Sequence, residues 1–455
     1  MQKKRANTCC FLHPFNHKYK LSVNLNFFLM KQHFLLLLLS MFLLIAFNKP
    51  ANDSSFVNDN FNYADKQLKN LLREADKNAL GFPKTTDKLG KLVTTNMYDW
   101  TPGFFPGNLW YTYEFTRDSM LGKAATGWTE KLEPLKDFTQ HHDLGFMMYC
   151  SFGNAYRITG NPAYKDILVQ SAKSLCTRFN PVTGCIKSWN TFPSWHGDKT
   201  YNFPVIIDNM MNLELLFFAS RQTGDTSFRH IAITHADNTL KNQIRKDYSS
   251  FHVVCYDTVS GSVLARETAQ GYADNSTWAR GHAWAIYGFT MTYRETKDKK
   301  YLQAARGLAD WYIDNKNLPA DFVPYWDFNA GQKGFTPGIK SHAKEYDLKL
   351  RDASAAAITA SALLELSTYP GNKGEKYRAA AVKILHSLAG PAYRAPLGAN
   401  GNFLLMHSVG SLAHGVEIDV PLSYADYYFI EALKRYNQLL SGKNVLGGNN
   451  SLAAE

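Results

Sequence analysis

The sequence lacks several signatures by which enzymes are commonly recognised. It has six cysteines in 455 residues, and their spacing matches no metal site and makes no disulfide scaffold in a chain of this size. It contains no glycine-rich phosphate loop before a helix, no Gly-x-Ser-x-Gly elbow and no His-Glu-x-x-His motif. These absences argue against phosphate-loop, serine-hydrolase and zinc-peptidase chemistry. We therefore expect neither a metal nor another cofactor.

Positive charge is scarcer in the body of the chain than the formal net charge of +11 suggests. Residues 1–49 hold seven lysines and arginines and no acid, which leaves a formal charge of +4 on the remainder. So small a net positive charge is more typical of a protein that binds a small acidic ligand than of one that binds a long polyanion in a groove. We therefore expect no nucleic-acid partner.

The first 49 residues predict a leader. A basic stretch around Lys31 precedes the apolar residues 34–47, a run too short to span a bilayer comfortably. Translation from Met30 would give this signal peptide an ordinary length. A retained anchor helix is the alternative, because no small-x-small cleavage site follows. We expect a secreted or periplasmic protein without stable membrane association after cleavage, in which residues 50–455 form one domain.

Turn signals recur along that domain. Acidic, amide or glycine-rich turns open apolar helices at residues 103–107, 142–145, 208–210, 280–284, 351–354 and 424–426. Second turns, each leading into a further helix, lie at residues 116–118, 159–161, 223–225, 296–298 and 370–372. One helix pair per roughly 45 to 75 residues is typical of an array in which no unit buries its own apolar face. Because six pairs can close into a ring, the sequence predicts an all-α fold, an (α/α)6 barrel or six-hairpin toroid.

The residues just before the inner helices of such a ring converge on one mouth. Asp143 follows two histidines there, and Asp208 follows the apolar residues 203–207. Burial favours the neutral acid and raises its pKa, and a second carboxylate raises the pKa further. Two carboxylates in an aromatic-lined cavity are the usual apparatus of sugar hydrolysis. The alternative is that such aspartates are ordinary helix N-caps.

Seven ordered segments carry a resemblance to a known family. They are residues 100–104, 142–146, 188–190, 207–212, 270–288, 326–329 and 351–356. From about residue 55 to 440 the chain resembles glycoside hydrolase family 88, the unsaturated glucuronyl hydrolases. The resemblance implies an (α/α)6 barrel. It also implies release of a 4,5-unsaturated uronic acid from the non-reducing end of lyase-generated, glycosaminoglycan-type oligosaccharides, by hydration of the C4=C5 enol ether.

The resemblance also implies roles for individual residues. Asp208 is the general acid and base, Asp143 is the second essential carboxylate, and His252 lies close to the reacting ring. The implied substrate-binding residues are His142, Gln270 and Arg280 around the uronate, and Trp100, Trp189 and Trp284 as faces for sugar rings. The partner is then an unsaturated oligosaccharide, and we expect a monomer or weak dimer.

Most of these residues have a structural alternative. The tryptophans and His252 are also typical of core packing, and Arg280 is alternatively an ion-pair partner of a barrel aspartate such as Asp274. We assign Asp352 and Asp426 to structural capping of later inner helices. Cys176 and Cys185 are the one cysteine pair close enough in sequence to suggest a bridge.

Two segments depart from the family pattern. A basic insertion at residues 331–350 carries Lys340, Lys344 and Lys349, which either meet an anionic group on the leaving sugar or lie in a solvated loop. Near the C-terminus, the Ser-x-x-Ser-x-Lys loop of members that favour sulfated substrates keeps its serines, but Ala413 replaces the lysine.

Two other functions compete with this interpretation. An unsaturated rhamnogalacturonyl hydrolase of family 105 shares the barrel and the chemistry but acts on pectin fragments. A non-catalytic glycan-binding toroid would use the same fold without chemistry, and the retention of both carboxylates argues against it.

Overall fold

The computed structural model describes residues 53–77 and 81–446. The chain divides into two units, Met1–Phe56 and Val57–Glu455, and only the first turn of helix α2 is described in the first unit. The leader predicted for residues 1–49 and the start at Met30 lie outside the described residues. Among the helices that are described, none is long and apolar enough to cross a bilayer.

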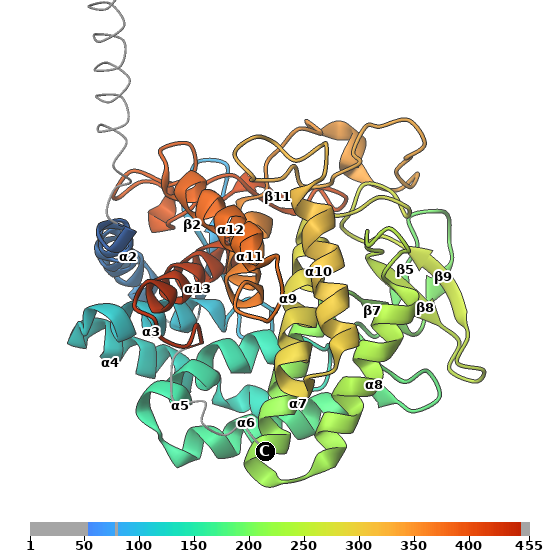
Figure 1. Cartoon of the computed structure of the whole chain (residues 1–455), viewed down its shortest axis with the longest axis horizontal. Helices are drawn as coiled ribbons and strands as arrows, with labels where there is room; N and C mark the ends of the chain where they lie inside the picture. Colours follow the sequence, from blue (N-terminus) through green and yellow to red (C-terminus); the bar gives the residue numbers. More distant parts are fainter. Residues whose placement is uncertain (1–52, 78–80, 447–455) are drawn as a thin grey trace, which may run out of the picture. The chain divides into compact units, whose positions relative to one another are not determined.

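Helices account for most of the second unit (Figure 1). The described residues form α2 (Asp53–Asp76), α3 (Phe104–Thr116), α4 (Ser119–Glu130), a π-helix η2 (Gly145–Gly153), α5 (Asn154–Thr159), α6 (Pro162–Cys176), α7 (Asn209–Thr223), α8 (Thr226–Asn242), α9 (Ala279–Thr296), α10 (Lys299–Ile313), α11 (Ala353–Leu366), α12 (Gly374–Ala389) and α13 (Ser423–Leu440). Short 3-10 turns lie at η1 (Glu133–Asp137), η3 (His342–Glu345) and η4 (Asn400–Asn402).

Small antiparallel sheets, which the all-α prediction did not include, lie between the helices. They pair β1 (Phe82–Thr86) with β2 (Leu92–Thr95), β3 (Phe179–Asn180) with β4 (Cys185–Ile186), β5 (Phe192–Pro193) with β6 (Thr200–Tyr201), and β10 (Ser408–Ser411) with β11 (Val416–Val420). A three-stranded sheet has the order β7 (Pro204–Ile206), β8 (Val253–Tyr256), β9 (Val263–Glu267). β5, β7, β8 and β9 gather at one side of the helices (Figure 1).

Alternate helices close into a ring. α3, η2, α7, α9, α11 and α13 each contact the next in this order, and α13 contacts α3. Every residue of α11 is buried, whereas α10, which packs outside α9, buries one face. A helix that is apolar all round must be covered on all sides, so α11 belongs to the inner ring and α10 to the outer layer. The predicted helical body is therefore confirmed as a helical toroid.

The predicted second turns join inner to outer helices through a repeated pair of caps. At the end of α7, Gly224 has a φ of +76°, and Asp225 accepts a hydrogen bond from the Ser227 amide to start α8. Lys297 and Asp298 do the same between α9 and α10. A left-handed residue ends one helix and a carboxylate satisfies the first amides of the next. Cys176 and Cys185 are free, so the suggested bridge is wrong.

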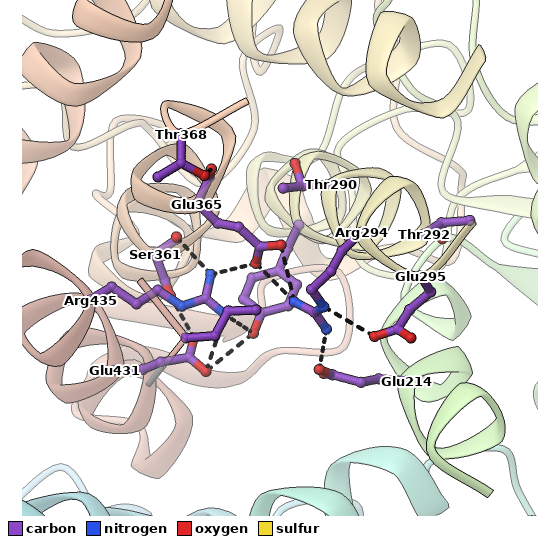
Figure 2. Close-up of polar contacts among 12 residues, drawn as sticks. Glu214, Thr290, Thr292, Arg294, Glu295, Ser361, Glu365, Thr368, Glu431 and Arg435 are labelled. Carbon is purple, nitrogen blue, oxygen red and sulfur yellow. Dashed lines mark hydrogen bonds and ion pairs between the residues drawn. The ribbon is translucent and has the colours of Figure 1, made fainter. Parts of the chain in front are cut away.

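A buried ionic network joins four inner helices (Figure 2). Arg294 of α9 pairs with Glu365 of α11 through Nη1 and Oε2 at 2.9 Å, and it also contacts Glu214 of α7. Arg435 of α13 reaches the same Glu365 oxygen at 3.1 Å. Glu365 is 1% exposed. Such a network stabilises a core only when each charge keeps its partners.

Replacing Glu365 by alanine should lower the free energy of unfolding by about 3–5 kcal/mol, because Arg294 and Arg435 then lie buried without their shared partner. Urea denaturation followed by circular dichroism measures the loss. Glu375→Ala is the matched control, since its pair with Arg378 at 3.0 Å is exposed and should contribute less than about 1 kcal/mol. Equal losses in the two variants would contradict the importance of the network.

Candidate active site

The three-stranded sheet brings the predicted site residues together. Ile206 pairs with Val253, and the Ile207 amide donates to the His252 carbonyl at 3.0 Å. Asp208, the next residue, therefore lies beside His252 although 44 residues separate them in the chain. Strand β9 continues into the loop that carries Gln270 on the other side of β8.

Close packing of η2 on α7 brings Asp143 near Asp208 and His252. A Cβ at Gly145 would lie 2.4 Å from the Asn212 Cα, so the two helices approach this closely only because residue 145 is glycine. The His142 amide also donates to the Ser188 carbonyl at 3.1 Å, and this bond fixes the segment before η2. Asp143 and Asp208 thus precede adjacent inner helices.

The side chain of Asp208 is buried and does not cap a helix. It precedes α7, but its side chain makes no cap hydrogen bond, so the N-cap alternative is wrong for this residue. The residue is 8% exposed, and Oδ2 has no hydrogen-bond partner among the described residues. Burial raises the pKa of Asp208 to about 7, and the charge of Asp143 adds to this while Arg280 opposes it. The acid therefore titrates near neutral pH.

Asp143 has the opposite electrostatic environment. Burial disfavours its charge, but His142 and His141 outweigh the burial and hold the pKa of Asp143 below its usual value. The Asp143 oxygens lie 3.0 Å from Nδ1 of His141 and 3.3 Å from Nε2 of His142. His141 was not among the predicted site residues, although its place next to His142 in the sequence was the available signal. The pKa values of the two carboxyls are therefore shifted in opposite directions.

Hydrogen bonds orient the imidazole of His142. The ring is fully buried, and burial lowers its pKa. The Phe146 amide donates to Oδ1 of Asn212 at 3.2 Å, so the Asn212 amide nitrogen faces Nδ1 of His142 at 3.4 Å. Nδ1 therefore accepts, and the proton of the neutral ring is on Nε2, which faces Asp143.

Main-chain amides set the tautomer of His252. The amides of Ala269 and Gln270 donate to its Nδ1 at 3.1 and 3.2 Å, which leaves the proton of the neutral ring on Nε2. Burial lowers the pKa of His252 well below its usual value, so the ring is neutral. Nε2 lies 3.7 Å from Oδ2 of Asp208 and has no other partner among the described residues. His252 therefore directs an N–H group into the site beside Asp208.

Arg280 is bound to the fold more tightly than expected. It is 1% exposed, its Nη1 lies 3.3 Å from Oδ2 of Asp352, and it donates to the carbonyls of Val409 and Gly410. Nε alone lacks a partner among the described residues. The alternative that Arg280 pairs with a barrel aspartate is confirmed, but the partner is Asp352 and not Asp274, which pairs with His196. Contact with a substrate carboxylate remains a prediction for Arg280.

The two later aspartates differ from each other. Asp352 caps α11, because its Oδ1 accepts from the Ser354 amide at 3.0 Å, as predicted. Asp426 lies inside the first turn of α13, and its oxygens accept from the amides of Leu404 and Leu405 at 2.8 and 2.9 Å. It is therefore structural, but as an anchor for a distant loop rather than as a helix cap.

The tryptophans occupy different environments. Trp189 is half-buried, with its ring 6.4 Å from His252, and Trp100 is half-buried against Tyr424. Trp284 is fully buried between two other aromatic rings, so the prediction that it offers a face to a sugar is wrong. Its indole N–H instead favours the charged form of Asp208. Trp278, with its ring 4.5 Å from His252, was not among the predicted site residues, although it lies within the family-like segment 270–288.

The basic insertion packs against neighbouring loops. The Lys340 amide donates to the Trp195 carbonyl at 3.1 Å, and its ammonium lies 2.9 Å from Asp198. Among the residues with described positions, no ion pair involves Lys344 or Lys349. A contact of these two lysines with the leaving sugar remains a prediction.

Comparisons with known proteins place these residues in context. No protein-family model matches the chain. An unsaturated glucuronyl hydrolase of Formosa agariphila is 48% identical over 343 residues, which cover 75% of this chain and 81% of the relative. An unsaturated chondroitin disaccharide hydrolase of Streptococcus agalactiae is 33% identical, with 78% and 85% covered. The crystal structure of an unsaturated glucuronyl hydrolase specific for heparin is 42% identical with a TM-score of 0.75, over 85% of this chain and 99% of that one.

Nitrogen-15 NMR of histidine-labelled protein should show His252 as the neutral, Nε2-protonated tautomer from about pH 5 to 8, because two amides occupy Nδ1 and burial disfavours the imidazolium. The imidazole signal that is missing from the spectrum of the His252→Gln variant is the signal of His252. His141 is an internal comparison, since its contact with Asp143 outweighs burial and raises the pKa of its ring. A charged ring or an Nδ1-protonated tautomer at His252 would contradict the assignment.

Proposed function

The chain belongs to the unsaturated glucuronyl hydrolases, and from that premise we propose that Asp208, Asp143 and His252 carry out its reaction. The enzyme is a glycosidase that acts on unsaturated, glycosaminoglycan-derived oligosaccharides. These relatives do not favour the rhamnogalacturonyl hydrolase alternative. The observation that supports the residue assignment is the pair of buried carboxyls whose pKa values shift in opposite directions.

The reaction starts with a proton on Asp208. That proton moves to C4 of the unsaturated uronate, and the double-bond electrons form the new C–H bond. Water adds to the cation-like C5 and returns a proton to Asp208, which regenerates the acid. The hemiketal formed at C5 opens by cleavage of the bond between C5 and the ring oxygen, which gives a ketone at C5 and a hemiacetal at C1. This hemiacetal collapses to an aldehyde and releases the remainder of the oligosaccharide as an alcohol.

Asp143 and His252 support the two proton transfers. Asp143, whose lowered pKa favours its charged form, accepts hydrogen bonds from sugar hydroxyls and favours the proton on Asp208, because two negative carboxylates at close range are unfavourable. The neutral His252 donates from Nε2 and stabilises Asp208 or the incoming water whenever negative charge develops there. Neither role requires His252 to change its protonation state.

Recognition of the sugar uses the half-buried groups around these three residues. We propose that Trp100 and Trp189 contact sugar rings and that His142 and Gln270 lie near the uronate. Arg280 acts on the uronate chiefly through its positive charge, because its Nη groups already bind the protein. A buried guanidinium attracts a nearby carboxylate strongly where water is excluded.

The finer architecture and the cellular location form part of the same proposal. The ring of inner helices with outer partners is consistent with an (α/α)6 barrel, and we assign residues 50–455 to it as one catalytic domain. The leader in residues 1–49 is consistent with a secreted or periplasmic enzyme that acts on fragments produced by polysaccharide lyases.

Asp208→Asn should lower kcat by at least about a thousandfold while the Kd for substrate changes little, because the amide keeps the shape and loses the transferable proton. Loss of the ultraviolet absorbance of the conjugated double bond of a chondroitin-derived disaccharide reports turnover. Asp426→Asn tests a buried carboxyl outside the site and should leave kcat nearly unchanged. Wild-type turnover in Asp208→Asn would remove Asp208 from the mechanism.

The pH dependence of kcat/KM provides a second test. Because Asp208 donates a proton and its pKa is about 7, kcat/KM should fall about tenfold per pH unit above neutrality. In Asp143→Asn this descending limb should move to lower pH in the residual activity, because the neighbouring negative charge no longer raises the pKa of Asp208. If the descending limb lay at the same pH in Asp143→Asn as in the wild type, the charge of Asp143 would not raise the pKa of Asp208.

A further inference from the structure

A large cavity lies at the other end of the inner helices. Its volume is about 1010 Å³, and its walls come from residues along η2 and α7 and from the later turns of α9 and α13. Asp143, Asp208 and His252 are not among its lining residues. Phe146 and Tyr428 line the cavity and pack on Trp284 at 5.0 and 5.2 Å, so a layer of aromatic rings separates the cavity from Asp208.

The wall of this cavity combines aromatic rings with ordered polar groups. Tyr149 and Tyr156 lie edge-on to Phe218, with ring centroids 5.6 and 5.7 Å away. Tyr287 and Glu431 close another part of the wall and hydrogen-bond to each other at 3.1 Å. Pockets of a few hundred to about 1000 Å³ that combine aromatic walls with convergent polar groups are typical of ligand sites.

Two polar groups in the wall remain unused by the protein. Glu214 binds Arg294 through Oε1, whereas its Oε2 accepts no hydrogen bond from a described residue (Figure 2). The Tyr149 hydroxyl likewise makes no hydrogen bond within the described part of the chain. Both residues line the cavity and are partly exposed. A carboxylate oxygen that accepts and a phenol that donates or accepts match the hydroxyl groups of a sugar.

The edge of the cavity carries positive charge. Lys297 follows the last residue of α9, and Lys443 follows the end of α13. Both are exposed, and neither forms an ion pair with the described residues. Glu214 lies on the second turn of α7, deeper in the ring. A ligand with hydroxyls at one end and a carboxylate at the other would match this order of charges.

We propose that this cavity is a second binding site, for an acidic saccharide whose hydroxyls reach Glu214 and Tyr149 and whose carboxylate meets Lys297 and Lys443. The site is distinct from the catalytic one and does not depend on which residues carry the hydrolysis. Because its ligand needs no double bond, saturated glucuronate-containing fragments would bind here without being cleaved.

Isothermal titration calorimetry of the full chain with a saturated hyaluronan tetrasaccharide tests the proposal. Tyr149→Phe should weaken this binding about fivefold, the effect of one lost hydrogen bond, and leave kcat/KM for an unsaturated disaccharide unchanged. Lys297→Ala with Lys443→Ala should weaken it about tenfold and reduce its salt dependence. These substitutions remove groups that bind no other part of the described structure.

Lys88→Ala with Lys91→Ala is the matched control, because these two lysines are equally exposed in the β1–β2 turn and line no part of the cavity. It should leave the tetrasaccharide affinity unchanged. Absence of binding to wild type would overturn the proposal. Binding that Trp189→Ala abolishes but the cavity variants leave intact would overturn it too, since the ligand would then occupy the catalytic mouth alone. An active Asp208→Asn variant would refute the catalytic assignment without changing these affinities.

Discussion

Removal of charged side chains from water is the constraint on which this structure depends. Inside the ring, Arg294, Arg435 and Glu365 lose their contacts with water, and ion pairs among them replace those contacts. The charges there therefore stabilise the packing of the helices. Beside His252, Asp208 loses its hydration in the same way, but its Oδ2 has no hydrogen-bond partner among the described residues. The same desolvation therefore accompanies a structural ion-pair network in one place and an acid with a raised pKa in the other.

Features that depend on local chemistry were predictable from the sequence. The helix pairs follow from turns such as Gly224-Asp225, where one residue ends a helix and the next caps another. The raised pKa of Asp208 follows from the apolar residues before it. The identification of the substrate chemistry came instead from ordered motifs that resemble a family, because two carboxylates alone do not specify which sugar bond is attacked.

Features that depend on distant parts of the chain were not predictable. Strands β7 and β8 are three and four residues long and carry no strong periodic signal, yet their pairing brings His252 to Asp208. Arg280 binds carbonyls at residues 409 and 410, about 130 positions away. Trp284 lies one turn further along the same helix but faces Phe146 and Tyr428, and a motif does not reveal which way a side chain on a fully buried helix points.

The amides that hold Nδ1 of His252 have a consequence for how this site can evolve. Every residue except proline contributes a main-chain N–H. The main-chain amides of Ala269 and Gln270 therefore set the position of the imidazole proton, whatever side chains these two residues carry. Substitutions at Gln270, other than by proline, therefore change its side chain without changing the direction of the His252 Nε2–H group. The main chain of residue 270 fixes the imidazole of His252, and its side chain is left independent of that constraint.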